Sequence, residues 1–375
     1  LLPFAQVMPD EIQVMPMQAM MAPQIRQDRQ WVAQPPRPLD GITDVIVNFE
    51  TNGLNWHRGD RALGVTVGTL DGGFQQYLPW GHTGGNLPRE QVVEFMRREL
   101  RGKKIHNLNM AFDIHMARGE GVDLEEQGNR VTDIAHTAAL LDDHRKRFAL
   151  DVLAQDYLGG AKIPRVDESR MADYHASDVA NRAEYQAVLV AQLHAKMSPQ
   201  IDEQGLRAVQ DLEDEVIFPV VEMEKNGAPI DMELLRSYSK EFQTWHEELL
   251  WAVSKEVGFA FDHTPASWRR LFEHLNLPIS YLESRDKEGK RKETYADTIL
   301  AKIEHPIVAK ARLAGQLASL NSKIMKPYLE MIGDDGILYY QINQLRGDDG
   351  GTVSGRFSIG YVQQVPNADN HAATF

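Results

Sequence analysis

Cysteine is absent from this chain of 375 residues. Without thiols the protein has neither disulfide bonds nor thiolate metal sites, which fits the reducing cytoplasm, and we expect it there. No stretch approaches the ~20 apolar residues of a membrane helix, so a water-soluble globular protein without membrane contact is predicted. No Lys or Arg precedes Arg26, and the apolar start therefore lacks the basic flank of a secretory signal.

Positive charge is also scarce. The chain has 40 Lys and Arg against 54 Asp and Glu, a formal net charge of −14, which argues against a protein that coats nucleic acid with a uniformly basic surface. Residues 251–330 are different, with 13 Lys and Arg against 10 Asp and Glu, a net charge of +3. The acidity belongs to the rest of the chain, so a phosphate-facing surface is permitted in the C-terminal third.

The apolar pattern divides the chain. Residues 1–40 hold 7 of the 18 prolines and 5 of the 14 methionines, and they predict an irregular arm. Residues 42–49 predict a buried strand, and residues 62–69 predict its hairpin partner. Helical and short strand patterns then alternate, which predicts an α/β domain with a mixed sheet and flanking helices over residues 41–203.

The later part of the chain is mostly helical by its pattern. Residues 206–225 and 232–256 are long amphipathic runs, separated by the breaker cluster Asn-Gly-Ala-Pro at 226–229. We therefore expect a helical region at 204–335. A strand pattern follows near its end.

Two polar side chains end the first predicted strand. Asn48 and Glu50 lie on one side of it by alternation, among residues typical of a core. Buried polar groups need partners. A strand end that reaches solvent explains this pair equally well when it is taken alone.

Two further polar pairs come at later helices. Asn109 and Asp113 open a helix after a strand, and an ordinary N-cap with a first-turn acid is the favoured interpretation in isolation. Tyr174 and Asp178 are four residues apart on a predicted helix, so they would share a face. His175 would point about 100° away.

Together, and in this order, the three motifs resemble the signature of the DEDD 3′–5′ exonucleases. That family has Asp-x-Glu at the end of the first strand, Asn-x-x-x-Asp at a helix start, and Tyr-x-x-x-Asp on a late helix. The resemblance implies a ribonuclease H-like fold of the tyrosine subclass. It also implies phosphodiester hydrolysis with two divalent ions, Mg²⁺ or Mn²⁺, because the metals activate water and stabilise the leaving oxyanion.

The resemblance assigns roles to the matching residues. Glu50, Asp113 and Asp178 are the implied metal ligands, and Glu50 is also catalytic. Tyr174 is implied to orient the attacking water. The residues implied to contact a frayed, single-stranded 3′ end are Thr51, Leu54 and Asn109.

One position departs from the family pattern. The family has Asp where this chain has Asn48, which would otherwise be a metal ligand and a catalytic residue. An amide keeps the shape and one oxygen but loses the charge, so metal affinity should collapse. We therefore expect a crippled exonuclease, whether Asn48 is natural or, as we favour, a deliberate change that traps intact DNA.

The remainder resembles family A DNA polymerases, those similar to bacterial polymerase I. Residues 221–231 (VEMEKNGAPID) look like the joint that opens the thumb of that family, and residues 261–272 (FDHTPASWRRLF) look like a following thumb segment. Residues 352–358 and 362–366 look like the family's Thr-Gly-Arg and Gln-x-(Ile/Val)-Pro motifs. A turn there would present Arg356, Gln363 and Gln364 to the minor groove, where acceptors common to all base pairs report geometry.

This resemblance implies a thumb at 204–335 and the beginning of a palm at 336–375. The thumb residues implied to meet primer–template phosphates are Ser319, Asn321 and Lys323. The implied function is a DNA-directed DNA polymerase with proofreading, active in replication. The family's palm carboxylates and fingers, which bind dNTPs, lie downstream of Phe375, so this chain is not expected to add nucleotides. By analogy, the arm favours a phage protein acting in the host cytoplasm.

Two other functions stay open. A stand-alone DEDD exoribonuclease similar to ribonuclease D is disfavoured by the polymerase-like segments. A non-catalytic DNA-holding module is compatible with Asn48. For the polymerase we expect the highest affinity for a recessed primer–template, with a steep loss of affinity in salt.

Overall fold

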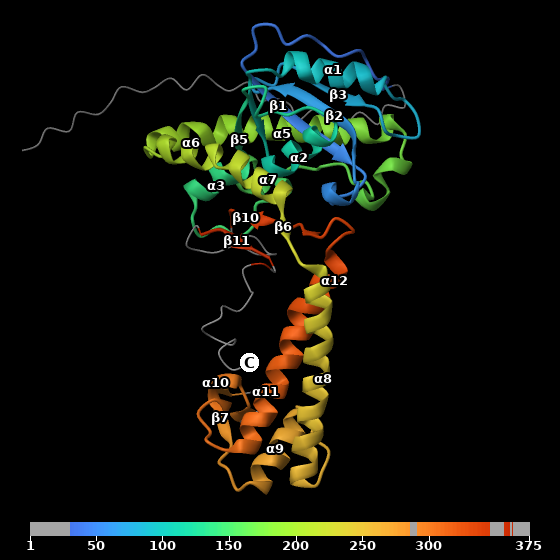
Figure 1. Cartoon of the computed structure of the whole chain (residues 1–375). Helices are drawn as coiled ribbons and strands as arrows, with labels where there is room; N and C mark the ends of the chain where they lie inside the picture. Colours follow the sequence, from blue (N-terminus) through green and yellow to red (C-terminus); the bar gives the residue numbers. More distant parts are fainter. Residues whose placement is uncertain (1–30, 286–290, 346–355, 361, 363–375) are drawn as a thin grey trace, which may run out of the picture. The chain divides into compact units, whose positions relative to one another are not determined.

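The computed structural model describes residues 31–285, 291–345, 356–360 and 362, drawn in colour in Figure 1. They belong to two compact units. The first unit comprises Leu1–Lys225 with Asn343–Ser358, and the second comprises Asn226–Ile342 with Ile359–Phe375. Most of the proline-rich arm predicted at 1–40 lies outside the described residues. None of the helices in the described ranges combines the length and apolar character that crossing a membrane requires.

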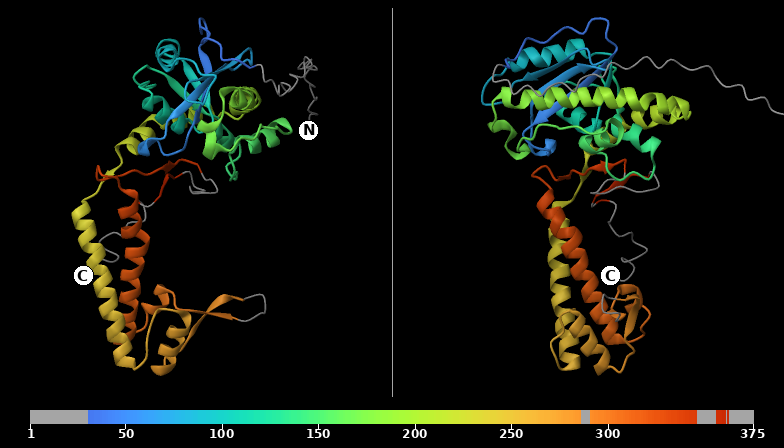
Figure 2. Two further views of the ribbon diagram at one scale, coloured as in Figure 1. Left: turned by 90° about the vertical axis from the view of Figure 1, so that its right-hand side faces the viewer. Right: turned by 180° about the vertical axis from the view of Figure 1, so that it is seen from behind.

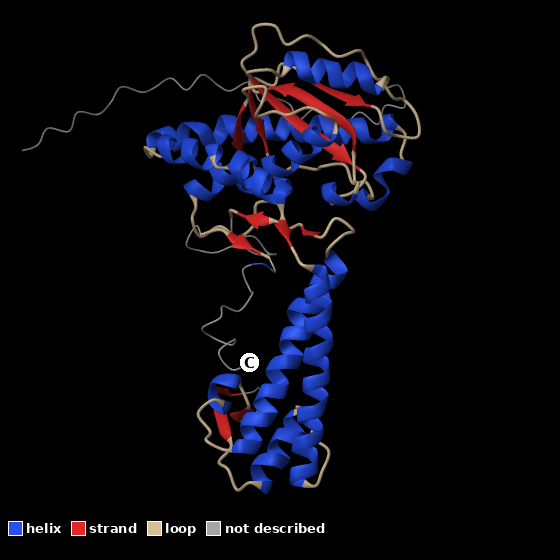
Figure 3. Ribbon diagram, viewed as in Figure 1, coloured by secondary structure: helices blue, strands red, loops and turns tan. Residues whose placement is uncertain are grey.

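A five-stranded sheet is the centre of the first unit (Figure 3). β1 pairs antiparallel with β2, and β2 with β3, whereas the pairs β1–β4 and β4–β5 are parallel. The predicted mixed sheet and the hairpin of its first two strands are confirmed. In sheet order the strands are β3 (Gln75–Pro79), β2 (Ala62–Thr69), β1 (Asp44–Thr51), β4 (Lys104–Asn107) and β5 (Arg130–Asp133).

Helices connect and cover these strands. The last two, α6 and α7, fall within the predicted helical region at 204–335, but Ile217 and Val221 of α7 pack in a core of the first unit. The helices are α1 (Arg89–Glu99), α2 (Met110–Gly119), α3 (Ile134–Leu141), α4 (Leu150–Leu158), α5 (Ala176–Glu203), α6 (Arg207–Glu215) and α7 (Ile217–Asn226), with 3-10 turns η1 (Trp56–Arg58) and η2 (Glu168–Asp173).

The strand β1 is buried on both faces because helices cover both sides of the sheet. Val45 and Val47 pack in a core with α1, α2 and α7, whereas Ile46 packs in another core with α3, α4 and α5. Side chains alternate between the faces of a strand. Asn48 and Glu50 therefore lie on the same face as Ile46, toward α5.

The second unit is mainly helical, with α8 and α11 side by side in Figures 1 and 2. Its elements are α8 (Met232–Val257), α9 (Pro265–His274), α10 (Asp297–Leu300), α11 (Pro306–Leu320) and α12 (Lys326–Met331), with the strand pairs β6 (Ala228–Pro229) with β9 (Ile337–Leu338) and β7 (Ser280–Arg285) with β8 (Arg291–Thr294). Two more short strands, β10 (Ile342–Asn343) and β11 (Ser358–Ile359), pair with each other.

Local sequence sets where the helices of the second unit begin. The Asp231 carboxylate accepts a hydrogen bond from the Leu234 N–H at 2.9 Å and caps α8. Proline occupies the first position of α9 and α11, where the missing N–H costs nothing. Between α11 and α12 the helix passes through a π-helical turn at Asn321–Met325 without breaking. This helix packs on α8 and holds the second unit together.

Candidate functional site

The C-terminal end of β1 places two polar side chains over α5. Glu50 is only 4% exposed, and burial raises the pKa of its carboxyl to about 7, although the charge of Arg182 opposes the rise. The pairing of β1 with β2 shifts register between Glu50 and Thr51. Such a bulge bends a strand and re-aims its side chains. The strand therefore ends its regular pairing at the residue that carries the carboxylate.

Asp113 comes to this strand end from α2. Its Oδ1 accepts a hydrogen bond from the Phe49 N–H at 2.9 Å, and its Oδ2 accepts one from Asn107 Nδ2 at 2.8 Å. Asn107 Nδ2 also donates to Asn48 Oδ1 at 3.1 Å. Asn48, Glu50, Asn107 and Asp113 form what we call the polar cluster. Three of these four residues were singled out in the sequence, and Asn107 was not.

The protonation of Asp113 follows from its surroundings. The residue is 2% exposed, and burial raises the pKa of its carboxyl to about 8. The two donated hydrogen bonds oppose the rise, while the nearby charges of Asp133 and Glu50 add to it. Two acidic groups with raised pKa values in one buried place are typical of a functional site, although structural networks also produce them.

Asn109 begins α2 in a strained backbone conformation. Its φ is +64°, in the left-handed region that non-glycine residues rarely adopt, and its side chain makes no capping hydrogen bond. Asp133 supplies the missing acceptors, because its Oδ2 accepts from the Met110 N–H and its Oδ1 from the Ala135 N–H, each at 2.8 Å. Asp133 therefore ties the starts of α2 and α3 together. Its place directly between a strand and a helix is the sequence signal that could have identified it.

The predicted shared helix face of Tyr174 and Asp178 is wrong. The helix α5 begins at Ala176, and Tyr174 precedes it in an extended conformation with φ −79° and ψ 153°. His175 takes the N-cap instead, and its Nδ1 accepts from the Ser177 N–H at 3.3 Å. The prediction that His175 points from a helical position is wrong for the same reason.

Tyr174 and Asp178 have surroundings of their own. The Tyr174 hydroxyl accepts a hydrogen bond from the Asp167 N–H at 3.1 Å. Asp178 is exposed in the first turn of α5. Within the described ranges, no hydrogen bond or ion pair joins either residue to Glu50 or Asp113. The structure therefore brings Asn48, Glu50 and Asp113 together and leaves Tyr174 and Asp178 outside this network.

Arg182 is another residue of the site that sequence reasoning missed. It follows Asp178 by one turn of α5, and its Nη1 donates to Glu50 Oε1 at 3.0 Å and Oε2 at 3.2 Å. Its Nη2 forms an ion pair with Glu168 of η2. The side chains of Arg182 and Glu50 are 11% and 5% exposed. The spacing of four residues from Asp178 was the available signal, since i and i+4 share a helix face.

These groups do not fit two divalent ions in the arrangement observed. Among the residues that the structure describes, no three His, Asp or Glu side chains gather closely enough to hold a metal ion. Asn48 contributes no charge, and Glu50 is paired with Arg182. Asp113 already accepts hydrogen bonds at both oxygens. Both bonds come from N–H donors, which take up lone pairs that a metal ion would need.

Two of the residues expected to contact DNA follow β1. The Thr51 hydroxyl donates to the Gly53 carbonyl at 2.8 Å, which shapes the turn after the strand. Leu54 is 74% exposed, an unusual position for a large apolar side chain. It offers an apolar surface close to the polar cluster in sequence.

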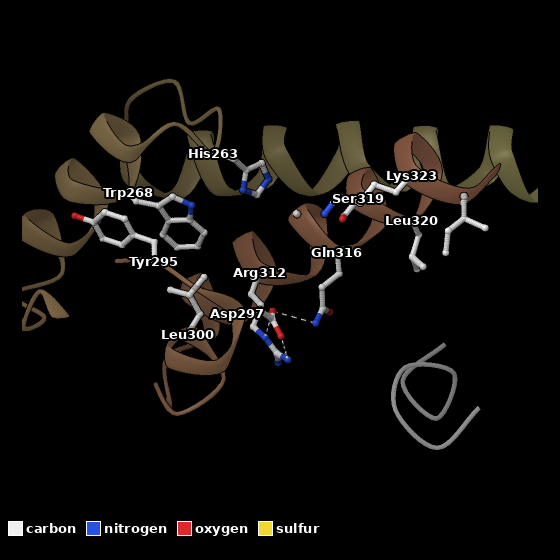
Figure 4. A pocket seen from close by; sticks show the side chains of 12 residues that line it. His263, Trp268, Tyr295, Asp297, Leu300, Arg312, Gln316, Ser319, Leu320 and Lys323 are labelled. Atoms are coloured by element: carbon white, nitrogen blue, oxygen red, sulfur yellow. Dashed lines mark hydrogen bonds and ion pairs between the residues drawn. The ribbon is translucent and has the colours of Figure 1, made fainter. Parts of the chain in front are cut away.

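A groove of about 500 Å³ in the second unit runs along one face of α11 (Figure 4). Ser319 and Lys323 line it, as residues four apart on a helix do. Arg312 forms a bidentate ion pair with Asp297 at 2.7 and 3.0 Å on the same groove. The apolar and aromatic side chains that line the groove are Trp268, Tyr295, Leu300, Leu320 and Ile324.

Asn321 does not share this face, contrary to the expectation that it meets phosphates beside its neighbours. It is 3% exposed, and its Oδ1 accepts a hydrogen bond from the Ser239 hydroxyl at 2.7 Å. A residue two positions from Ser319 and Lys323 points to the opposite side of the helix. Arg356 is exposed, whereas Gln363 and Gln364 lie outside the described residues.

Comparison with known proteins adds relatives along most of the chain. The chain is 26% identical over 366 residues to a DNA polymerase DpoZ of Salmonella phage PMBT28, and 27% identical over 372 residues to a DNA polymerase DpoZ of Acinetobacter phage SH-Ab 15497. These matches cover 89% and 90% of this chain but 57% and 58% of the relatives. The chain thus spans less than two thirds of the length of these curated relatives. No family model matches it.

A further relative and a solved structure are also named as polymerases. The thermostable DNA polymerase I of Thermus filiformis is 25% identical over 265 residues, which are 66% of this chain and 30% of that protein. The POL domain of Pol1 from M. smegmatis, solved in complex with DNA primer–template and dNTP, has a TM-score of 0.67 at 19% identity. The likeness covers 86% of this chain and 52% of that chain, and it shows a shared fold.

Proposed function

We propose that this chain, a phage-like relative of the family A DNA polymerases, is part of a replicative DNA polymerase. In this proposal the first unit is an exonuclease-type domain and the second unit is the thumb. The observation that carries it is the meeting of Asn48, Glu50 and Asp113 at the end of β1. It occurs in a chain that matches phage DNA polymerases over about nine tenths of its length.

The first unit, in this proposal, holds a single-stranded 3′ end more readily than it cuts it. Exposed Leu54 can pack on an unpaired base, and we assign polar contacts with the same strand to Asn109 and Thr51. Asn48 lacks the charge that two-metal hydrolysis demands at its position. We therefore assign strand holding to this chain, and proofreading hydrolysis only to a form of the protein that has Asp at position 48 and a Glu50 open to divalent ions.

The second unit, in this proposal, binds the primer–template duplex. Ser319 of α11 and Lys323 of the π-helical turn after it line the same groove, in the part of the chain whose net charge is +3. Lys323 can neutralise a phosphate and release its counterions. Arg356 is exposed, and we assign it a contact with the duplex. Nucleotide addition from dNTPs we assign to a protein of the full length of the relatives.

Binding to DNA of different forms tests the proposal. We expect the chain to bind a recessed primer–template more tightly than a blunt duplex, with affinity that falls steeply as salt rises. Lys323→Ala should weaken binding to all sequences and lower the slope of log affinity against log salt by about 1. Lys302→Ala removes an exposed Lys outside the groove and should leave the slope unchanged.

Fluorescence anisotropy at several salt concentrations measures these quantities. Equal slopes for the wild type and Lys323→Ala would remove Lys323 from the proposed interface. Tighter binding to structured RNA than to primer–template DNA would instead favour the exoribonuclease. A chain that binds neither would contradict both.

A further inference from the structure

We propose that Arg182 takes the place of a metal ion at Glu50, so that the polar cluster is held together by a cation belonging to the chain itself. The proposal rests on the proposed function only in taking the cluster as an exonuclease-type site. Its physical content is a competition between a guanidinium group and a divalent ion for the same carboxylate. That competition can be measured without DNA.

Arg182 contacts both carboxylate oxygens of Glu50. One guanidinium nitrogen lies 3.0 Å from Oε1 and 3.2 Å from Oε2 of Glu50, so both oxygens already accept from it. The same nitrogen lies 3.2 Å from Gln186 Oε1, one turn further along α5. The second terminal nitrogen pairs with Glu168, whose side chain is 73% exposed. Arg182 is therefore held on three sides, and Glu50 is its buried carboxylate partner.

Burial makes this pairing exclusive. With side-chain exposures of 11% and 5%, Arg182 and Glu50 are largely removed from water. An unpaired charge in such a place is strongly unfavourable, so Glu50 in its ionised form needs a cation beside it. A second cation cannot be added at the same oxygens, because it would meet the guanidinium group without water to screen the repulsion. A divalent ion can bind Glu50 only after Arg182 withdraws.

Asn48 and Arg182 fit this arrangement together. Asn48 carries no charge, so Glu50 is the carboxylate that the C-terminal end of β1 contributes to the polar cluster. The charge of Arg182 compensates the charge of that carboxylate. An Asp at position 48 would add a negative charge but would leave the guanidinium group on Glu50. The Asn48→Asp change alone should therefore restore little metal binding. Divalent ions should bind at Glu50 only when Asn48 is replaced by Asp and the charge of Arg182 is also removed.

Mn²⁺ binding to the full chain tests this inference. The variants are Asn48→Asp, Arg182→Gln and the double variant, with titration of Mn²⁺ alone followed by electron paramagnetic resonance. We expect no Mn²⁺ bound at Glu50 in the wild type and weak binding in either single variant. The double variant should bind roughly tenfold or more tightly than either, a coupling typical of groups that share one site. Adding Glu50→Gln to the double variant should abolish this binding.

A matched control separates charge removal in general from removal of this cation. Arg170→Gln removes an exposed Arg that pairs with Asp173 and does not touch Glu50. Combined with Asn48→Asp, it should leave Mn²⁺ affinity at the level of Asn48→Asp alone. The melting temperature gives a second measurement. Arg182→Gln should lower it, and Mn²⁺ should restore part of the loss only in the double variant, because metal binding stabilises the folded state.

Several outcomes would overturn the inference. If Asn48→Asp binds Mn²⁺ as tightly as the double variant, Arg182 does not compete with the metal. If the wild type binds Mn²⁺ and Glu50→Gln abolishes that binding, Arg182 does not exclude the metal ion from Glu50. If Arg182→Gln does not fold, Arg182→Lys is the substitute variant. It keeps the charge but has only one nitrogen, so it cannot contact Glu50 and Glu168 with separate nitrogens as Arg182 does. In the Asn48→Asp background it should give a Mn²⁺ affinity above that of Asn48→Asp, and equal affinities would contradict the competition.

The exonuclease-type function and the competition between Arg182 and a divalent ion can be contradicted by different results. Trimming of single-stranded DNA should appear in the double variant alone, and trimming by Asn48→Asp without the second change would contradict the role of Arg182. If the double variant binds Mn²⁺ tightly but neither binds nor trims DNA, the exonuclease-type function is wrong while the competition stands.

Discussion

At the scale of single residues, burial decides which groups of the first unit carry charge. His106 of β4 is 2% exposed, and its Nε2 lies 3.0 Å from Asp44 Oδ1. Its ring also lies edge-on to that of His194, with centroids 4.8 Å apart. Burial lowers the pKa of His106 to about 4, and the hydrogen bond to Asp44 opposes this only in part. The imidazole is therefore neutral in the folded protein at pH 7.

This buried histidine should make the first unit sensitive to acid. The folded pKa of about 4 lies below the ordinary value of 6.5, so the unfolded chain takes up a proton that the folded chain refuses. Stability is then present above pH 6.5 and is lost as the pH falls toward 4, by on the order of 3 kcal/mol for a shift of this size. His106→Gln should flatten the pH dependence of the unfolding free energy in urea. His144→Gln, at an exposed position, should leave it steep.

The residues of the polar cluster show how far sequence reasoning reaches at this scale. Asn48, Glu50 and Asp113 could be predicted to meet, because alternation along β1 and the order of the motifs restrict where each can lie. Arg182 could not be predicted, since its partner Glu50 is 132 residues away and the contact depends on how α5 crosses the sheet. The charge of a single buried side chain thus decides what the site can bind.

At the scale of elements, one side chain positions the helix that carries Asp113. Asp133 ends β5 and accepts hydrogen bonds from the Met110 N–H of α2 and the Ala135 N–H of α3. A helix start leaves four N–H groups without partners inside the helix. Asp133 is only 5% exposed. If its carboxylate were removed, the two N–H groups bonded to it would have few water molecules with which to form hydrogen bonds. The beginnings of the two helices therefore depend on each other.

Replacing Asp133 should loosen both helix starts. Asp133→Ala removes two buried acceptors, and we expect a loss of roughly 2 to 4 kcal/mol in the unfolding free energy of the first unit. Asp133→Asn keeps one carbonyl oxygen and should lose about half as much. Chemical denaturation followed by circular dichroism measures the difference. Equal losses in the two variants would show that the number of acceptors at this position is not what matters.

The elements were predicted better than their ends. The hairpin of β1 and β2 follows from apolar residues that local sequence displays, and the long helix α8 follows from amphipathic periodicity. The start of α5 was misplaced because His175 is an unusual N-cap, and the ordinary capping residues gave no signal there. The two-residue difference removed Tyr174 from the helix.

At the scale of the whole molecule, the two units have separate cores. The core around β1, α1 and α2 contains no residue of the second unit, and the core of α8, α9 and α11 contains none of the first. Hydrophobic stabilisation depends on the apolar area each core buries. Each unit is therefore expected to unfold in a transition of its own.

Core substitutions should move these transitions one at a time. Phe272 is 1% exposed in the core of the second unit, and Phe272→Ala should cost about 3 to 5 kcal/mol there. Val47→Ala is the corresponding change in the first unit. Differential scanning calorimetry should show that each variant lowers one transition and leaves the other in place. A common shift of both would mean that the units unfold as one.

The π-helical turn between α11 and α12 has a consequence for how this protein can vary in length. A π turn contains about one residue more than an α-helical turn. Loss of one residue from Asn321–Met325 would therefore leave a regular α-helix and keep the residues after it in their orientation, so that Tyr328 stays in the core that it shares with Ile332 and Leu338. Loss of one residue from the regular α-helix on either side would instead turn Tyr328 by about 100° and remove it from that core. Within the second unit, the π turn is thus the place in this helix where the chain can lose a single residue.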